Sequence, residues 1–376
     1  MHLSHSGSPA LDRDSAALIR AHRAVEIVFG GDSFSLSSDP ADRDALESTV
    51  ALLKAHPALS AALREHLAAG ASVTWLAGNH DQALVHPRAR EVLLTMLDLQ
   101  ASAPLAIEAW FLRRGGVHIE HGHLWDPDNA PAHPLAAWSD ATEPLGIALT
   151  RGFVARYKLW HFAHAHETTL AGGVASAFAL YGTRAPLLIL RYLRRSGALV
   201  ANSLRDRGLS AERQRGHERL VEHSARTGIP RNALEALIAA APEPTHSRFS
   251  TLFLRLYYDR VFAALGLGAG VVGSAVTFTP LPLALAAGSG AYLGWNVRRS
   301  GSRYQNMPIR RLREGAATVR ALTQAELVVF GHTHVPELAD GYANPGSFGY
   351  PTPGPGRPYL SIDAQGKPEL SRWQTP

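Results

Sequence analysis

The chain has 376 residues, which is long enough for a full hydrophobic core and for more than one domain. It contains no cysteine, and this excludes disulfides and thiolate metal sites, so a bound metal would be held by His, Asp, Asn or Glu. The net charge of +5 is compatible with binding to anionic lipid or nucleic acid and also with a plain basic surface.

Alternating helical and strand-like segments predict an α/β fold. In chain order, the expected elements of the first third are a helix over 14–23, a strand over 25–29, helices over 42–55 and 58–67, a strand over 72–76, a helix over 88–97, and a hairpin of strands over 105–112 and 117–120. Near the carboxyl end we expect a strand over 327–330 and a hairpin over 359–363 and 369–373.

Four of these strands run into short clusters of residue types that bind metals. The clusters are Gly30-Gly31-Asp32, Gly78-Asn79-His80-Asp81, His121-Gly122-His123 and Gly331-His332-Thr333-His334. A single Asp or His after a strand is more often part of a turn than of a site, but turn chemistry does not explain four such clusters. Open α/β sheets place their ligands at the carboxyl ends of the strands, so we expect these side chains to meet there.

The four clusters, in this order, resemble those of the calcineurin-like metallophosphoesterases, over residues 1–125 and 315–376. The resemblance implies an α/β fold built as a four-layer α/β/β/α sandwich with two divalent metal ions, Mn in the first place and Fe or Zn as alternatives. It assigns the bridging carboxylate to Asp32, one ion to Asn79, His121 and His332, and the other ion to His2 and His334. His80 resembles the imidazole that contacts phosphate and protonates the leaving group, and Asp81 resembles the residue that orients it.

Two positions depart from the family pattern. The family begins with Asp-x-His after a first strand, and Met1-His2 looks like the x and the His without the aspartate. The natural start is therefore expected a few residues upstream, or else one ion is held more weakly. Ser35 stands where many relatives carry a second acid, which is usually not a direct ligand.

The resemblance implies a phosphohydrolase that cleaves a phosphoester or pyrophosphate bond. In this chemistry a hydroxide that bridges the two ions attacks phosphorus, and His80 would supply a proton to the leaving group. No covalent nucleophile is required, and the sequence predicts no substrate-binding residue.

Residues 126–314 are expected to form a helical insertion outside the sandwich. Within it, residues 261–297 contain no charged or histidine side chain and would measure about 55 Å as one helix, beyond the ~30 Å of a bilayer core. Pro280 and Pro282 should break this run into two arms. Arginines flank both ends, so a hairpin in the bilayer with both ends on one side is expected. A buried helical pair in a soluble insertion is the alternative.

Other parts of the insertion give weaker predictions. Small residues recur every four positions on both arms and should let them pack closely: Gly266, Gly270, Ser274, Ala286, Gly290 and Gly294. Residues 187–193, with arginines nearby, are expected as an amphipathic helix on lipid headgroups or as a solvated helix. His161, His164 and His166 are expected in a His-rich helix rather than in a metal site, and 208–241 as two polar helices with His217 and His223 facing water.

Together these features predict a metal-dependent phosphohydrolase at the cytoplasmic face of a membrane of the bacterial inner-membrane type, since the amino terminus shows no secretory signal. The expected substrate is phosphorylated and lipid-linked. Among relatives the chain looks most like the UDP-2,3-diacylglucosamine diphosphatases, although His121-Gly122-His123 replaces their His-Gly-Asp. The alternatives are a soluble substrate with the hairpin as an anchor only, and a non-catalytic scaffold with a degraded metal site. Nucleic-acid binding is not expected, because the basic residues lie beside apolar stretches.

Overall fold

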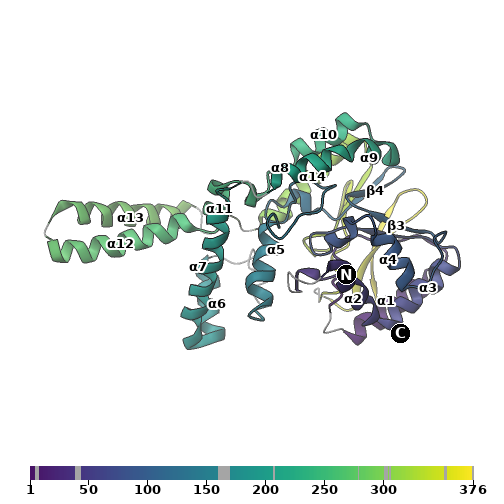
Figure 1. The fold of residues 1–376 in the computed structure, drawn as a ribbon, viewed down its shortest axis with the longest axis horizontal. Coiled ribbons are helices and arrows are strands. Elements are labelled where there is room, and N and C mark those ends of the chain that lie inside the picture. The colour runs from purple at the N-terminus through teal and green to yellow at the C-terminus, as the bar shows by residue number, and fades with distance from the viewer. Residues whose placement is uncertain are drawn as a thin grey trace. The chain divides into compact units, whose positions relative to one another are not determined.

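The computed structural model describes residues 1–4, 8–38, 44–159, 170–205, 208–277, 279–299, 304, 306–350 and 354–374 (Figure 1). By its contacts the chain divides into two compact units. Unit 1 comprises Met1–Arg151, Gly208–Pro244 and Pro308–Pro376, and unit 2 comprises Gly152–Arg207 and Thr245–Met307. The segment expected as an insertion, 126–314, thus contributes to both units. The boundaries between the expected sandwich and the expected insertion, after residue 125 and before residue 315, stay a prediction.

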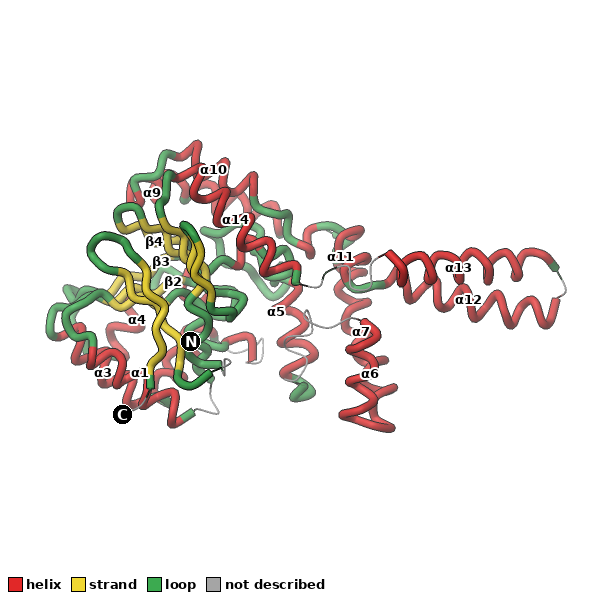
Figure 2. The backbone as a smooth tube through the Cα atoms, turned by 180° about the vertical axis from the view of Figure 1, so that it is seen from behind, coloured by secondary structure: helices red, strands yellow, loops and turns green. Residues whose placement is uncertain are grey.

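Unit 1 is mixed α/β, as expected, and its described strands form three sheets (Figure 2). A parallel sheet has the order β1 (Ile27–Phe29), β2 (Val73–Leu76) and β3 (Leu105–Glu108). A mixed sheet has the order β4 (Phe111–Arg114), β5 (Val117–Glu120), β6 (Leu327–Phe330), β8 (Tyr342–Asn344) and β7 (Glu337–Ala339). An antiparallel hairpin joins β9 (Arg357–Ile362) to β10 (Pro368–Trp373).

The helices of unit 1 begin and end where the local sequence supplies caps. The first, α1 (Pro9–Ala21), starts earlier than predicted, because the Ser8 side chain accepts a hydrogen bond from the Leu11 amide and proline suits the first turn. It packs on α3 (Pro57–Ala68), after which Gly70 has a φ of 85°, the left-handed conformation that favours glycine at the end of a helix. The other α-helices are α2 (Ala45–Lys54), α4 (Ala89–Met96), α5 (Leu145–Leu149), α8 (Leu209–Glu218), α9 (Leu220–Thr227), α10 (Arg231–Ala240) and α14 (Met307–Thr323).

The predicted strand over 105–112 is wrong as a single element. The structure divides it into β3, which pairs parallel to β2, and β4, which pairs antiparallel to β5 in the other sheet. The chain crosses between the sheets at Ala109 and Trp110, and both residues are buried. Because these two residues are as apolar as the strands beside them, the hydropathy pattern gives no sign of the crossing.

Two predictions for residues 208–241 are also corrected. The segment forms three helices, α8, α9 and α10, rather than two. His217 is exposed as predicted, but His223 on α9 is buried and stacks on Trp110 with a ring separation of 5.6 Å. Because α9 has only 8 residues, its amphipathic pattern does not indicate which face of the helix packs against Trp110 and Phe111.

The buried imidazole of His223 makes the fold sensitive to acid. Burial lowers the pKa of His223 to about 3, and the charge of Arg226 contributes to the same shift. Between this value and the ordinary pKa of about 6.5, the unfolded chain binds more protons than the folded chain, so stability falls as the pH is lowered. We expect His223→Phe to reduce the loss of melting temperature between pH 7.5 and 5 relative to the wild type. His217→Phe, at an exposed site, should leave the pH slope unchanged, and equal slopes in all three proteins would contradict the argument.

Unit 2 is helical in its described part. It contains α6 (Leu170–Tyr181), α7 (Ala185–Asn202), α11 (Phe249–Arg255), α12 (Tyr258–Thr277) and α13 (Pro280–Arg299). The last two are antiparallel neighbours, and the break between them lies where the prolines predicted it (Figure 1). A Cβ at Gly270 would lie 2.6 Å from the Ala286 amide nitrogen and 2.6 Å from the Pro282 carbonyl, so glycine is needed for this close approach.

Two helices have the length and composition of a membrane span, namely Gly172–Asn202 and Tyr258–Thr277. The first includes the segment for which the sequence predicted a helix on lipid headgroups. Large apolar side chains on α12 and α13 are exposed, up to 70% for Val276 and 77% for Leu281. His161, His164 and His166 lie outside the described residues.

Candidate metal centre

Unit 1 brings the four predicted clusters together at the carboxyl ends of their strands. Asp32 follows β1, Asn79 follows β2, His121 follows β5, and His332 follows β6. Strands β5 and β6 pair side by side in parallel, so the residues after them arrive at the same edge of the sheet. The two sheets therefore meet at this point through the loops that carry the clusters.

One group of candidate ligands consists of Asp32, His121 and His332, whose ligand atoms all lie within 4.8 Å of one another. His121 Nε2 lies 3.0 Å from Asp32 Oδ2, 3.1 Å from Asn79 Oδ1 and 3.3 Å from His332 Nδ1. The other nitrogen of His121, Nδ1, is 3.0 Å from the Gly30 carbonyl oxygen and can donate to it. In the neutral tautomer that donates to Gly30, Nε2 carries no proton and is directed at the group, as a metal-binding imidazole requires.

A second group consists of His2, Asp32 and His334, with ligand atoms again within 4.8 Å. His2 Nε2 and His334 Nε2 are 2.9 Å apart, and His2 Nε2 is 3.7 Å from Asp32 Oδ2. Two imidazole lone pairs at this distance repel each other unless a proton or a cation lies between them. Asp32 belongs to both groups. Its carboxylate therefore has the position that a ligand shared by two ions would require.

The backbone at the candidate ligands is strained. His2, Asp32, His332 and His334 have φ values of 61°, 52°, 30° and 58°, and they make up four of the nine non-glycine residues with positive φ in the described part of the chain. Side chains disfavour this region, and residues held there concentrate at functional sites. The loops thus adopt an unfavourable backbone conformation at the four positions where these side chains face the site.

Two glycines leave room for the ligands. A Cβ at Gly31 would lie 2.4 Å from His121 Nδ1, and a Cβ at Gly78 would lie 2.2 Å from Asp32 Oδ1. Any larger residue at either position would displace a candidate ligand. The glycines in these two clusters therefore have a packing role as well as a role in turning the chain.

The structure places His80 and Asp81 differently from the expected pair. The His80 ring lies 5.3 Å from the His2 ring, and its Nδ1 forms a short hydrogen bond with Ser37 Oγ. The Asp81 carboxylate accepts hydrogen bonds from the backbone amides of four residues, namely Asp32, Ser33, Phe34 and Gly78. Ser37, rather than Asp81, thus contacts the His80 imidazole, and Asp81 holds the Asp32 loop against the Gly78 turn.

The sequence did not predict two polar residues beside the ligands, the buried Asp126 and the half-buried Asn129, and it assigned no role to His123, although it placed this residue in one of the four clusters. Asp126 Oδ2 lies 2.9 Å from His332 Nε2, and Asn129 donates to Asp126 Oδ2 at 2.7 Å while accepting from the Asn79 amide at 3.2 Å. His123 is buried, with Nδ1 lacking a hydrogen-bond partner among the described residues, and its ring is 5.4 Å from that of His121. The run Asp126-Pro127-Asp128-Asn129, a few residues after His121, was the available signal.

The surroundings of the site hold Asp32 as a carboxylate and favour neutral imidazoles at His2 and His80. Burial alone would raise the pKa of Asp32, but His121 and His80 hold it well below its usual range. Burial lowers the pKa of His2 and of His80, although Asp32 opposes the shift. Burial opposes the charged form of His121 too, yet Asp32 raises its pKa overall. Asp32 and His2 thus favour the protonation states in which they can act as ligands, whereas a metal ion bound at His121 would have to displace a proton.

The donor set fits divalent ions of intermediate hardness. It offers imidazole nitrogens, a carboxylate and an amide oxygen, and the chain has no thiol. Such a set suits Mn, Fe or Zn better than Ca or Cu(I).

Comparison with known protein families, with curated proteins and with solved structures gave no significant match. The function must therefore be argued from the geometry of this site.

Proposed function

We propose that the protein is a metal-dependent phosphohydrolase of the calcineurin-like metallophosphoesterase type. The observation that carries the proposal is a buried carboxylate, Asp32, which belongs to two groups of histidines at once. A carboxylate with histidines on both sides is the arrangement needed for two neighbouring divalent ions, and paired ions of this kind are typical of phosphoester hydrolysis.

The finer fold is part of the same proposal: a four-layer sandwich with helices outside two facing sheets. In its support, α1 and α3 contribute Leu11, Leu59 and Leu63 to one core cluster with Val73 and Trp75 of the parallel sheet. The helix α14 contributes Leu312, Ala316 and Val319 to the same cluster, together with Val328 and Phe330 of the mixed sheet.

In this proposal Asn79, His121 and His332 would hold one ion, His2 and His334 would hold the other, and Asp32 would serve both. The ions, Mn in the first place and Fe or Zn as alternatives, would supply Lewis-acid activation of water and of the phosphoryl group. His80 would be the proton donor in its imidazolium form, in which Nδ1–H donates to Ser37 Oγ and Nε2–H is left to meet the leaving oxygen. Asp126 and Asn129 orient His332 and Asn79 from behind.

The second half of the chain supports a proposal about the substrate class. The apolar side chains of α12 and α13 are exposed, whereas a helical pair buried in a soluble insertion would cover them. Exposed apolar helices of this length favour contact with a bilayer, and the flanking arginines favour its cytoplasmic side. We therefore propose a phosphoester or pyrophosphate with an acyl or prenyl tail as the substrate.

The proposal is tested by hydrolysis of bis(p-nitrophenyl) phosphate by the full chain in lipid nanodiscs. Activity should require added Mn²⁺ and should vanish in His332→Ala, while His217→Ala, at an exposed histidine of the same unit, should retain it. A lipid pyrophosphate in mixed micelles should then be cleaved in preference to a soluble nucleotide-sugar diphosphate. Chains that neither bind metal nor hydrolyse any ester would favour the non-catalytic scaffold. Preference for the soluble substrate would indicate that the hairpin serves only as a membrane anchor.

A further inference from the structure

The histidines of the two candidate ligand groups are oriented in different ways. In one group, His121 Nδ1 lies 3.0 Å from the Gly30 carbonyl oxygen, a good distance for a hydrogen bond that fixes the ring. In the other group, His2 Nδ1 lies 3.4 Å from Ser35 Oγ, which is long for a hydrogen bond. Another kind of contact must therefore contribute to the orientation of the rings in the second group.

A tyrosine supplies such a contact. The Tyr350 ring stacks on the His334 ring with centroids 5.0 Å apart and an interplanar angle of 28°, and its centroid lies 4.7 Å from that of His2. The His2 and His334 rings themselves lie 4.7 Å apart at 80°. Stacked and edge-to-face rings attract each other beyond the area that they bury. Tyr350 thus restricts the rotation of both candidate ligands.

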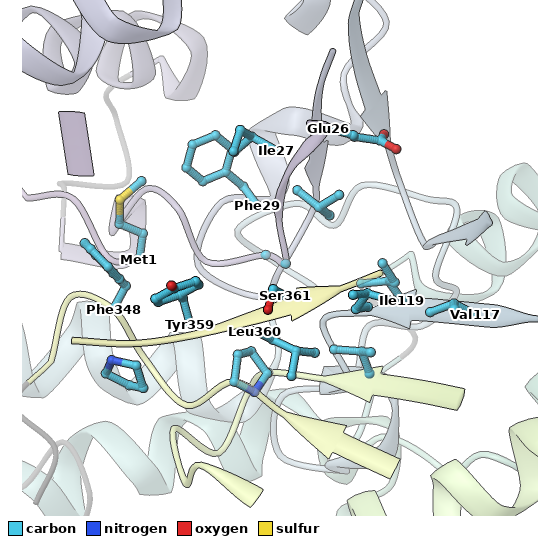
Figure 3. A pocket seen from close by; sticks show the side chains of 18 of the residues that line it. Met1, Glu26, Ile27, Phe29, Val117, Ile119, Phe348, Tyr359, Leu360 and Ser361 are labelled. Atoms are coloured by element: carbon cyan, nitrogen blue, oxygen red, sulfur yellow. The ribbon is translucent and has the colours of Figure 1, made fainter. Parts of the chain in front are cut away.

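The loop that carries Tyr350, residues 345–350 after β8, is itself held in place. The Tyr350 amide donates to Ser347 Oγ at 3.3 Å, and the Phe348 carbonyl accepts from Arg357 Nη1 at 2.9 Å. The Phe348 side chain packs against the core of unit 1 and lines the cavity beside the candidate metal centre (Figure 3). The stacking ring is therefore mounted on a loop with fixed contacts on both sides of the turn.

The start of this loop is joined to the loop that carries His334. Asn344 is buried at the end of β8, and its Nδ2 donates to the Gly331 carbonyl at 2.7 Å and to Thr333 Oγ1 at 3.0 Å. Its Oδ1 accepts from the Gly346 amide at 2.9 Å. One side chain therefore fixes the spacing between the loop of the histidine and the loop of its stacking partner.

We propose that Tyr350 is a positioning residue for the ion assigned to His2 and His334, and that it acts through the face of its ring. The Nε2 atoms of these histidines lie 2.9 Å apart, and both residues have a strained backbone with positive φ. The ring keeps the two atoms directed at one point, and without it the imidazoles can rotate apart. The inference rests on the proposed function, because it presupposes the metal centre, and it adds a residue that lies in none of the four clusters.

The test is Mn²⁺ binding by the full chain in lipid nanodiscs, followed by calorimetry and by electron paramagnetic resonance. The wild type should bind two equivalents and give the broadened spectrum of a spin-coupled pair. Tyr350→Leu should keep the first equivalent and bind the second about 10-fold more weakly, at the lower end of the range for partners of metal ligands, with the sharp lines of an isolated ion. Tyr350→Phe retains the ring and should behave as the wild type.

Tyr359→Leu is the matched control. Tyr359 belongs to another tyrosine–histidine ring pair of unit 1, with its centroid 5.8 Å from that of His22, which is not a candidate ligand. This variant should bind both ions as the wild type does. Because Tyr350 is 38% exposed, the melting temperature of metal-free Tyr350→Leu should stay close to that of the metal-free wild type.

Four outcomes would overturn the inference. Two tightly bound ions in Tyr350→Leu would do so and leave the proposed function intact. Equal weakening in Tyr350→Phe would assign the effect to the hydroxyl group and not to the ring. A large fall in the melting temperature of metal-free Tyr350→Leu would show a role in the fold instead. A wild type that binds no metal would overturn the metal centre itself and the role of Tyr350 with it.

Discussion

Replacement of Asp32 by asparagine is expected to empty the metal centre and to abolish hydrolysis. Of the six predicted ligands, Asp32 alone carries a negative charge, since the five others are histidines and an asparagine. Its Oδ2 atom lies 3.0 Å from His121 Nε2 and 3.7 Å from His2 Nε2, so both groups lose the same anion at once. The amide that replaces the carboxylate is of equal size, and the effect should therefore come from charge rather than from packing.

The loss of metal and activity in Asp32→Asn can be compared with that expected for Asp126→Asn, because Asp126 contacts the candidate ligand His332. Outer partners of metal ligands are typically worth about 10–100-fold in affinity or activity, so Asp126→Asn should fall in that range. Asp32→Asn should exceed it in both metal content, measured by elemental analysis of the purified protein, and kcat/KM. Asp340→Asn, whose side chain is fully exposed, is the matched control and should change neither. An Asp32→Asn protein that retains two equivalents of metal would contradict the shared role.

The elements around this centre were predictable because their signals are local. The apolar run Leu327–Phe330 ends in Gly331-His332, and the structure places a buried strand and a candidate ligand there. The clusters after β1, β2 and β5 follow the same rule, since polar residues directly after an apolar strand have few roles other than turns and sites. Parallel pairing then brings them to one edge, which is a general property of such sheets.

The features that were missed depend on contacts that sequence alone does not display. Asp126 and Asn129 do not follow a strand, so nothing in the hydropathy pattern linked them to His332 and Asn79. The burial of His223 is set by Trp110, more than a hundred residues away in the chain. The apolar run over 105–112 gave no hint that it serves two sheets, because both strands read alike.

Asp81 is a different kind of miss, because its position was predicted and its contacts were not. The resemblance assigned it to orienting His80, but its carboxylate accepts the Gly78 and Ser33 amides at 2.6 Å each and lies within 3.2 to 3.4 Å of the Asp32 and Phe34 amides. The residue is fully buried. It therefore ties together the two loops that carry Asp32 and Asn79.

We expect Asp81→Ala to destabilise unit 1 strongly, because it leaves buried backbone amides without acceptors. Each unsatisfied group costs roughly 1–3 kcal/mol, so the two short bonds alone predict a loss of about 3 kcal/mol or more. For a unit of this size the melting temperature should fall by roughly 10 °C. Asp44→Ala is the matched control: Asp44 also accepts a backbone amide, that of Glu47, but at the exposed start of α2, and its loss should cost only about 1 kcal/mol.

Asp81→Asn separates the two roles that the residue could have. The asparagine side chain keeps one acceptor oxygen, but its NH₂ group faces backbone N–H groups that are themselves donors. A structural role of Asp81 therefore predicts a lower melting temperature. In that case kcat should fall only as far as the Asp32 loop shifts. A role through His80 predicts the reverse, an unchanged melting temperature with a reduced kcat and an altered pH profile. Since Ser37 Oγ, and not Asp81, bonds to His80 Nδ1, Ser37→Ala should change the pH profile at unchanged melting temperature. The two variants thereby decide whether Asp81 supports the loops and Ser37 orients the imidazole, or whether Asp81 orients the imidazole instead.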